Sequence, residues 1–168
     1  VIIPTDKELT CSDVENIIAT TDAKAIIYTE NCTEGRMAAE KTGIAQFDLS
    51  CLSEYIDEGN ALRQSGDASY ENHKIDPDGA GIIIFTSGTS GKPKGVMLSQ
   101  YNICSDIMSV LKRIKVEPSD RVLSVLPLHH TYECTAGFLA VLYCGASIAY
   151  AESIRRMVGD MKIFKPTL

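Results

Sequence analysis

Short runs of branched apolar residues alternate with helical patterns along most of this 168-residue chain. Runs such as "AKAIIYTE" (23–30), "GIIIFTSG" (81–88) and "RVLSVLPL" (121–128) predict strands. Between 103 and 114, apolar residues recur at i, i+4, i+7, i+8 and i+11, which is one face of a helix. Strands rich in Ile and Val that alternate with helices are typical of a mainly parallel sheet covered on both faces. The sequence therefore predicts an α/β fold, a three-layer α/β/α sandwich.

The other elements follow from apolar spacing and from capping residues. Thr10 or Ser12 is expected to cap the first helix. Ser99 is expected to cap the helix that contains the 103–114 apolar face, and Ser153 the last helix. Polar residues over 65–79 predict a surface connection. The remaining predicted elements are helices over 34–41, 53–64, 135–143 and 154–164, and strands over 45–50, 95–99 and 146–152.

Charge and composition exclude several classes of protein. The net charge is −6, with 22 acidic and 16 basic residues, which argues against a general nucleic-acid binder. No run of about 18 apolar residues is present, so no membrane span is expected, although peripheral membrane contact stays open. The six cysteines form no CxxC pair and are interpreted as small apolar residues in a reducing cytoplasm. Neither disulfides nor a protein metal site is predicted.

A loop of small polar residues directly follows the most hydrophobic predicted strand. The ten residues "TSGTSGKPKG" (86–95) hold three Gly, two Thr, two Ser, two Lys and one Pro. In open α/β sheets, ligands bind beyond the carboxyl ends of strands, which is where this loop lies. The alternative is a hairpin turn between two strands, in which Gly and Ser are only turn residues.

The composition of the loop suits a polyphosphate. Glycine lets backbone N–H groups approach phosphate oxygens, while hydroxyls and lysines add further donors. A P-loop is excluded because Lys92 is followed by Pro93 rather than by Ser or Thr, and because no helix is expected before about Ser99. A dinucleotide fingerprint is excluded because no GxGxxG occurs. The candidate phosphate-binding residues are Thr86, Ser87, Gly88, Thr89, Ser90, Gly91, Lys92, Lys94 and Gly95.

Two stretches resemble the AMP-forming adenylating enzymes, which include acyl-CoA synthetases, luciferases and adenylation domains of peptide synthetases. "FTSGTSGKPKGVMLSQYN" (85–102) is similar to that family's signature, with departures at Phe85, Ser90 and Gln100. "LPLHHTYECTAG" (126–137) is similar to a segment found especially in long-chain fatty-acid–CoA ligases. The resemblance is specific in these two segments and loose over the rest of the chain.

This resemblance implies a two-step reaction of a carboxylic acid. The carboxylate of the acid attacks the α-phosphate of ATP to give an acyl adenylate and pyrophosphate. The acyl group then passes to a thiol, usually that of coenzyme A, and AMP is released. Mg²⁺ is expected to help neutralise the meeting of two anions. The loop would hold the β- and γ-phosphates, and His130 matches a position that lines the acyl-carboxylate pocket.

The neighbours of His130 are expected to have other roles, and a role for His129 stays open. Glu133 is interpreted as a solvent-exposed or helix-start acid, and Tyr132 as a packing residue. His73 is expected to be solvated in the polar connection.

The resemblance also predicts that residues 1–168 are part of an N-terminal AMP-binding domain, truncated at both ends. The family's ribose, adenine and metal contacts and its mobile C-terminal domain all lie further downstream. We therefore expect the isolated chain to be inactive. Two alternatives stay open: an adenylation domain that loads a carrier protein, and a noncatalytic α/β domain.

Overall fold

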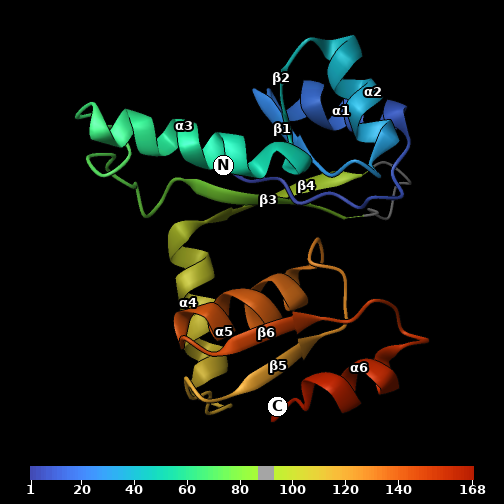
Figure 1. Ribbon diagram of the computed structural model, residues 1–168, viewed down its shortest axis with the longest axis vertical. Helices are drawn as coiled ribbons and strands as arrows, with labels where there is room; N and C mark the ends of the chain where they lie inside the picture. The colour runs from blue at the N-terminus through green and yellow to red at the C-terminus, as the bar shows by residue number, and fades with distance from the viewer. Residues whose placement is uncertain (87–92) are drawn as a thin grey trace. The chain divides into compact units, whose positions relative to one another are not determined.

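The computed structural model describes residues 1–86 and 93–168, which divide into two compact units (Figure 1). One unit is Asp6–Lys74. The other combines Val1–Thr5 with Ile75–Leu168 and carries the described part of the predicted site.

The Asp6–Lys74 unit is built around a βαβ motif. Its elements are α1 (Cys11–Thr21), β1 (Ala25–Tyr28), α2 (Thr33–Thr42), β2 (Ala45–Asp48), a 3₁₀ turn (Leu49–Cys51) and α3 (Leu52–Gln64). Strands β1 and β2 are parallel, and α2 makes the crossover between them. The core of this unit lies where Val14 and Ile18 of α1 meet Ala38 of α2. Helix α1 buries Val14, Ile17 and Ile18 on one face, and α2 buries Ala38 and Ala39.

Helix α1 begins where the capping pattern predicts. Thr10 is the N-cap, and its hydroxyl oxygen accepts a hydrogen bond from the backbone N–H of Asp13. The Asp13 carboxylate accepts in return from the backbone N–H of Thr10, which completes a capping box. Thr10 is thus the cap, and Ser12 lies inside the helix.

The second unit begins with an antiparallel strand pair. Its elements are β3 (Ala80–Thr86), β4 (Lys94–Ser99), α4 (Gln100–Leu111), β5 (Arg121–Ser124), the π-helix η2 (Glu133–Leu139), α5 (Ala140–Tyr143), β6 (Ser147–Tyr150) and α6 (Met157–Phe164). Ile2 forms a parallel bridge with Ile82 of β3. Ser99 caps α4 as predicted. Ile103 and Ile107 of α4 form a buried cluster with Ala140 of α5.

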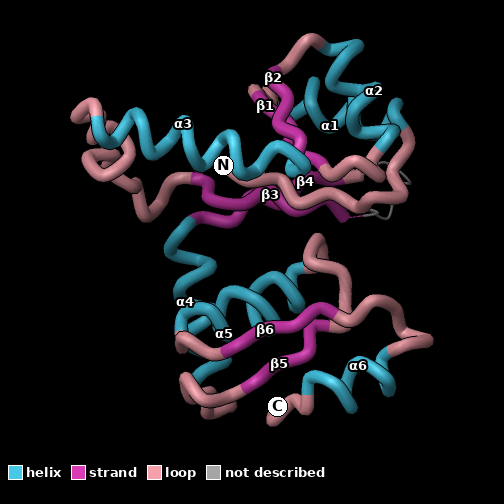
Figure 2. Tube along the Cα trace, viewed as in Figure 1, coloured by secondary structure: helices cyan, strands magenta, loops and turns pink. Residues whose placement is uncertain are grey.

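The α/β class with mainly parallel strands is confirmed. Figure 2 shows the strands lying in pairs. Two of the three pairs, β1–β2 and β5–β6, are parallel. In the described residues the strands form three two-stranded sheets, which differs from the one continuous sheet that the alternating pattern suggests. Each pair joins strands that are consecutive in the chain, because such neighbours pair most readily.

Several boundaries differ from the predicted ones in the second half of the chain. Strand β5 ends at Ser124, before Pro127, which has no N–H to donate to a ladder. Helix α6 begins at Met157 with Arg156 at its N-cap, so Ser153 is not the cap. The helix predicted over 135–143 begins earlier, as the π-helix η2, and continues as α5.

The last two predictions about the fold concern disulfides and membrane-spanning helices. All six cysteines lie in described residues and are free. Within 1–86 and 93–168, no helix is long and apolar enough to cross a membrane.

Candidate functional site

The end of the β3–β4 pair brings two predicted phosphate-binding residues together. Thr86 and Lys94 are Cα partners in the antiparallel ladder, and both are exposed. The hydroxyl of Thr86 and the ammonium of Lys94 therefore lie at the mouth of the loop that joins the strands. A hydroxyl donor and a cation at one point are chemically suited to an anion.

Gly95 has a packing reason to be glycine in addition to its predicted role. A Cβ there would lie 3.0 Å from Cγ2 of Ile83 and 3.3 Å from Cζ of Phe85. Phe85 is the Cα partner of Gly95 across the ladder. The missing side chain lets the Phe85 ring lie over β4, directly beside the Thr86–Lys94 pair.

Six of the predicted binding residues lie outside the described residues: Ser87, Gly88, Thr89, Ser90, Gly91 and Lys92. The flanking residues Thr86 and Lys94 still help to decide between a hairpin turn and a binding loop. The strands are antiparallel, as the hairpin alternative requires. Residues 87–93 separate the paired Thr86 and Lys94, which is longer than the common hairpin loops of about two to five residues. The simple turn is therefore the weaker of the two interpretations.

His130 lies on the segment between β5 and η2. Its backbone N–H donates to the carbonyl of Pro127 at 3.0 Å, and its own carbonyl accepts from the N–H of Cys134 at 3.0 Å. A turn on one side and the first helical hydrogen bonds on the other thus fix the backbone of His130. Its side chain is exposed, and its ring centroid lies 4.5 Å from that of the half-buried His129.

The predicted site residues fall into two groups. Within the described residues, no hydrogen bond or ion pair joins His130 to Thr86 or Lys94. Each group is open to solvent, so a substrate can reach either one. No three His, Cys, Asp or Glu side chains in the described part of the chain are placed to hold a metal ion.

Glu133 is the residue that sequence reasoning missed. It was expected to be a solvent-exposed or helix-start acid, and it does begin η2, but its exposed fraction is only 5%. Its carboxylate accepts a short hydrogen bond from the hydroxyl of Ser124, which is also buried. A signal was available, because Gly137 follows one helical turn later and leaves room for a side chain.

The surroundings of Glu133 affect neighbouring groups. The pKa of Tyr150 is raised by burial and, to a smaller extent, by the charge of Glu133. Burial alone raises the pKa of the Cys134 thiol, which keeps it protonated and unreactive. Two other predictions had different outcomes: Tyr132 is exposed rather than packed, while His73 is exposed as expected.

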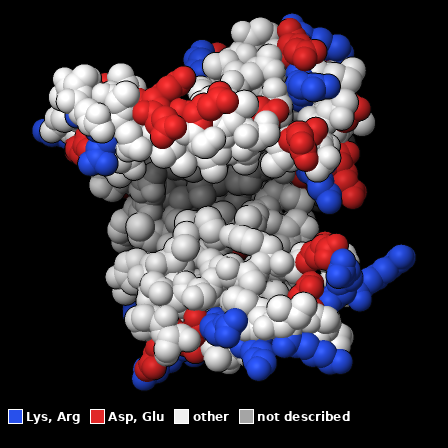
Figure 3. Space-filling model, in the orientation of Figure 1, with Lys and Arg blue, Asp and Glu red and all other residues white. Residues whose placement is uncertain are grey.

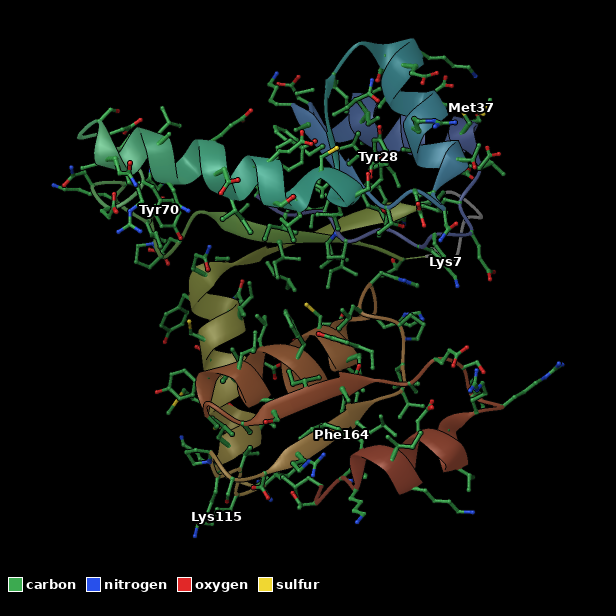
Figure 4. The ribbon with its side chains drawn as sticks, viewed as in Figure 1. Lys7, Tyr28, Met37, Tyr70, Lys115 and Phe164 are labelled. Carbon is green, nitrogen blue, oxygen red and sulfur yellow. The ribbon has the colours of Figure 1, made fainter. Side chains whose placement is uncertain are left out.

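A shallow cavity of about 320 Å³ lies between β5, β6 and α6. The guanidinium of Arg121 lies over the ring of Phe164, 4.4 Å from its centroid (Figure 4). Few charged side chains cover the region of α5 and β6 on the face that Figure 3 shows. Leu142, Tyr143 and Tyr150, which belong to these elements, are exposed. This cavity shares Tyr150 with the surroundings of Glu133 but contains neither His130 nor the β3–β4 end.

Comparison with known proteins gives a consistent family. A family model described as AMP-binding enzyme matches residues 1–168. A chloroplastic long-chain fatty-acid–[acyl-carrier-protein] ligase of Arabidopsis thaliana is 35% identical over 126 residues, which cover 72% of this chain and 17% of that protein. Long-chain fatty-acid–CoA ligase 5 of Rattus norvegicus is 32% identical over 171 residues, which cover 94% and 25%. The chain thus spans a quarter or less of the length of these two relatives.

Solved structures show the same fold. ATP-bound MatB from Rhodopseudomonas palustris matches with a TM-score of 0.74 at 21% identity, over 97% of this chain and 32% of that one. VinN in complex with L-aspartate matches with a TM-score of 0.81 at 18% identity, over 99% and 41%. These likenesses confirm the fold class that the sequence predicts.

Proposed function

Because the chain belongs to the AMP-binding enzyme family, we propose that it is part of an ATP-dependent, AMP-forming ligase that activates a carboxylic acid. Fatty acids are the substrates we infer, since relatives over most of the chain are named as long-chain fatty-acid ligases. The observation that carries this proposal is the pairing of Thr86 with Lys94 at the mouth of a long Gly- and Ser-rich loop.

The chemistry assigned to each group follows from charge. An anionic carboxylate must approach a polyphosphate, so preorganised donors are needed where negative charge develops. Thr86, Lys94 and the loop between them would hold the β- and γ-phosphates while pyrophosphate departs. Mg²⁺, carried in with ATP, would neutralise further phosphate charge. His130 would lie beside the carboxylate of the acid.

For the second step we propose coenzyme A as the thiol acceptor. One relative is named as a CoA ligase and another as an acyl-carrier-protein ligase, so the carrier protein is the second candidate. We further propose that residues 1–168 are a portion of the N-terminal domain, because they cover only 32% and 41% of the two similar structures. Six free cysteines favour a reducing compartment such as the cytoplasm.

Exchange of radiolabelled pyrophosphate into ATP tests the first step. The full-length protein that carries this chain is expected to catalyse exchange only when a fatty acid is present. It should release AMP rather than ADP. The proposal would be contradicted if no carboxylic acid in a panel of chain lengths supports pyrophosphate exchange, or if the protein releases ADP.

Two further measurements separate the alternatives. Acyl transfer to coenzyme A and to acyl carrier protein can be compared after the adenylate has formed. The isolated 168-residue chain is expected to show no exchange. A full-length protein that neither exchanges pyrophosphate nor binds ATP·Mg would instead favour the noncatalytic α/β domain, in which the loop is only a turn.

A further inference from the structure

Glu133 is the single buried charged side chain in the described parts of the chain. Burying a carboxylate is unfavourable unless hydrogen bonds replace its water, and replacing it with an apolar residue often costs no stability. Stability alone therefore does not account for an acid at this position.

The Ser124–Glu133 hydrogen bond joins the two ends of the segment that carries His130. Ser124 is the last residue of β5, and Glu133 is the first residue of η2. Residues 125–132 lie between them and include both adjacent histidines. A side-chain contact across the base of this segment limits how far its ends can separate. The backbone of the segment is thus tied to two regular elements.

The helix that follows is shaped to receive the carboxylate. A Cβ on Gly137 would lie 2.5 Å from Oε1 of Glu133, and its three nearest atoms would all belong to that carboxyl group. The helical turn is wide here, since the N–H of Ala140 donates to the carbonyl of Thr135, five residues earlier. Wide π turns of this kind occur frequently at functional sites.

The segment has further bonds on its helical side. The Cys134 N–H donates to the His130 carbonyl, and the Thr135 hydroxyl donates to the Thr131 carbonyl at 2.8 Å. These bonds make the backbone after His130 continuous with η2. A displacement of Glu133 at the start of η2 would therefore be transmitted to His130.

We propose that Glu133 and Ser124 position His130 for the carboxylic acid substrate, by a buried hydrogen bond that closes the β5–η2 segment. The inference rests on the proposed function. Glu133 acts through the backbone and is a positioning residue, since His130 is the group assigned to contact the substrate.

Gly137→Ala tests this without removing either partner. The added methyl group would collide first with the carboxylate of Glu133 and push it away from Ser124. Alanine also favours helix more than glycine does, so the melting temperature should not fall through loss of helix propensity. We expect the KM for the fatty acid to rise about tenfold, with the KM for ATP unchanged. Gly159→Ala is the matched control, because a Cβ there meets nothing within 4 Å.

Removing the partners gives the second test. Ser124→Ala and Glu133→Ala should each raise the KM for the acid about tenfold, and the double variant should cost no more than either single one. Glu133→Gln, whose amide oxygen can still accept from Ser124, should recover part of the loss. Glu152→Gln removes an exposed acid and should leave the kinetics unchanged.

Hydrogen exchange separates failure of this inference from failure of the proposed function. Amides in residues 125–135 should exchange faster in Ser124→Ala, with exchange elsewhere unchanged, even if the protein activates no acid. The inference would be overturned if the folded Ser124→Ala and Gly137→Ala variants had wild-type rates of amide hydrogen exchange in residues 125–135. Wild-type values of KM for the acid in an active protein would also overturn it.

Discussion

The two units of the molecule differ in what they bury. In Asp6–Lys74 the described interior consists of small and apolar side chains, such as Val14, Ile18 and Ala38. The buried polar side chains of the described residues are Ser124, Glu133 and Thr135, and all lie in the other unit. Buried polar groups are costly unless hydrogen bonds replace their water, so an interior that retains and pairs such groups points to a requirement other than stability. We infer that Asp6–Lys74 contributes mainly stability, while the other unit carries the described part of the proposed site.

The largest expected effect tests the apolar side of this comparison. Ile18→Ala removes a side chain that is 8% exposed in the core of Asp6–Lys74. Truncation of a buried Ile costs about 2–5 kcal/mol of stability. Activity per folded molecule should stay unchanged, as judged by kcat and both KM values below the melting temperature.

Ile107→Ala is the matched variant in the other unit, since Ile107 is also 8% exposed. The two should lose similar amounts of free energy of unfolding. An Ile18→Ala protein that is stable but has altered KM values would break the division between the units.

The next largest effect concerns the β3–β4 end. Lys94→Ala removes the ammonium group of the residue that pairs with Thr86. A hydrogen bond to a charged group contributes about 1.5–3 kcal/mol. The rate of fatty-acid-dependent exchange of pyrophosphate into ATP should therefore fall roughly 10- to 150-fold. The melting temperature should not change, because Lys94 is exposed. Lys115→Ala, which removes an exposed lysine after α4 (Figure 4), is the control and should retain full exchange activity.

How far the sequence predicts this molecule depends on the range of the interactions. Local signals succeeded: Thr10 and Ser99 cap their helices, because a cap needs only residues within one turn. The partner of a strand is set by distant residues, so the three separate strand pairs were not predicted. Glu133 is predicted as a solvent-exposed or helix-start acid; it does begin η2, but its burial was not predicted because its partner, Ser124, comes from a different element. The π turn was missed because it breaks the regular helical period.

Helix capping offers a smaller, symmetrical comparison. Both units contain a capping box: Thr10 with Asp13 in α1, and Ser99 with Asn102 in α4. Thr10→Ala and Ser99→Ala should each cost about 1 kcal/mol of stability. Hydrogen exchange of the first-turn amides in each helix measures the local loss. A much larger loss at Ser99 would mean that α4 depends on the adjoining β4 more than capping alone explains.

The smallest effect is a pH dependence in Asp6–Lys74. A hydrogen bond from Lys41, with the nitrogen 2.8 Å from the carboxylate, is the main reason why the pKa of Glu15 lies below its ordinary value of 4.5. The depressed pKa makes the ionised form stabilising in the folded state, so this contribution is present above pH 4.5. It is lost as the pH falls through the lower folded value.

Lys41→Met should therefore reduce the loss of stability on acidification, as measured by urea unfolding at a series of pH values. Lys74→Met removes a lysine from the same unit and serves as the control for net charge. Identical acid dependence in wild type and Lys41→Met would contradict this assignment to Glu15.

A crystal structure of the full-length protein with ATP·Mg and a fatty acid tests the central claim most directly. The account predicts that β- and γ-phosphate oxygens lie within hydrogen-bond distance of residues between Thr86 and Gly95, with the acid carboxylate beside His130. Phosphates bound elsewhere, with the β3–β4 loop making no contact to the nucleotide, would contradict it.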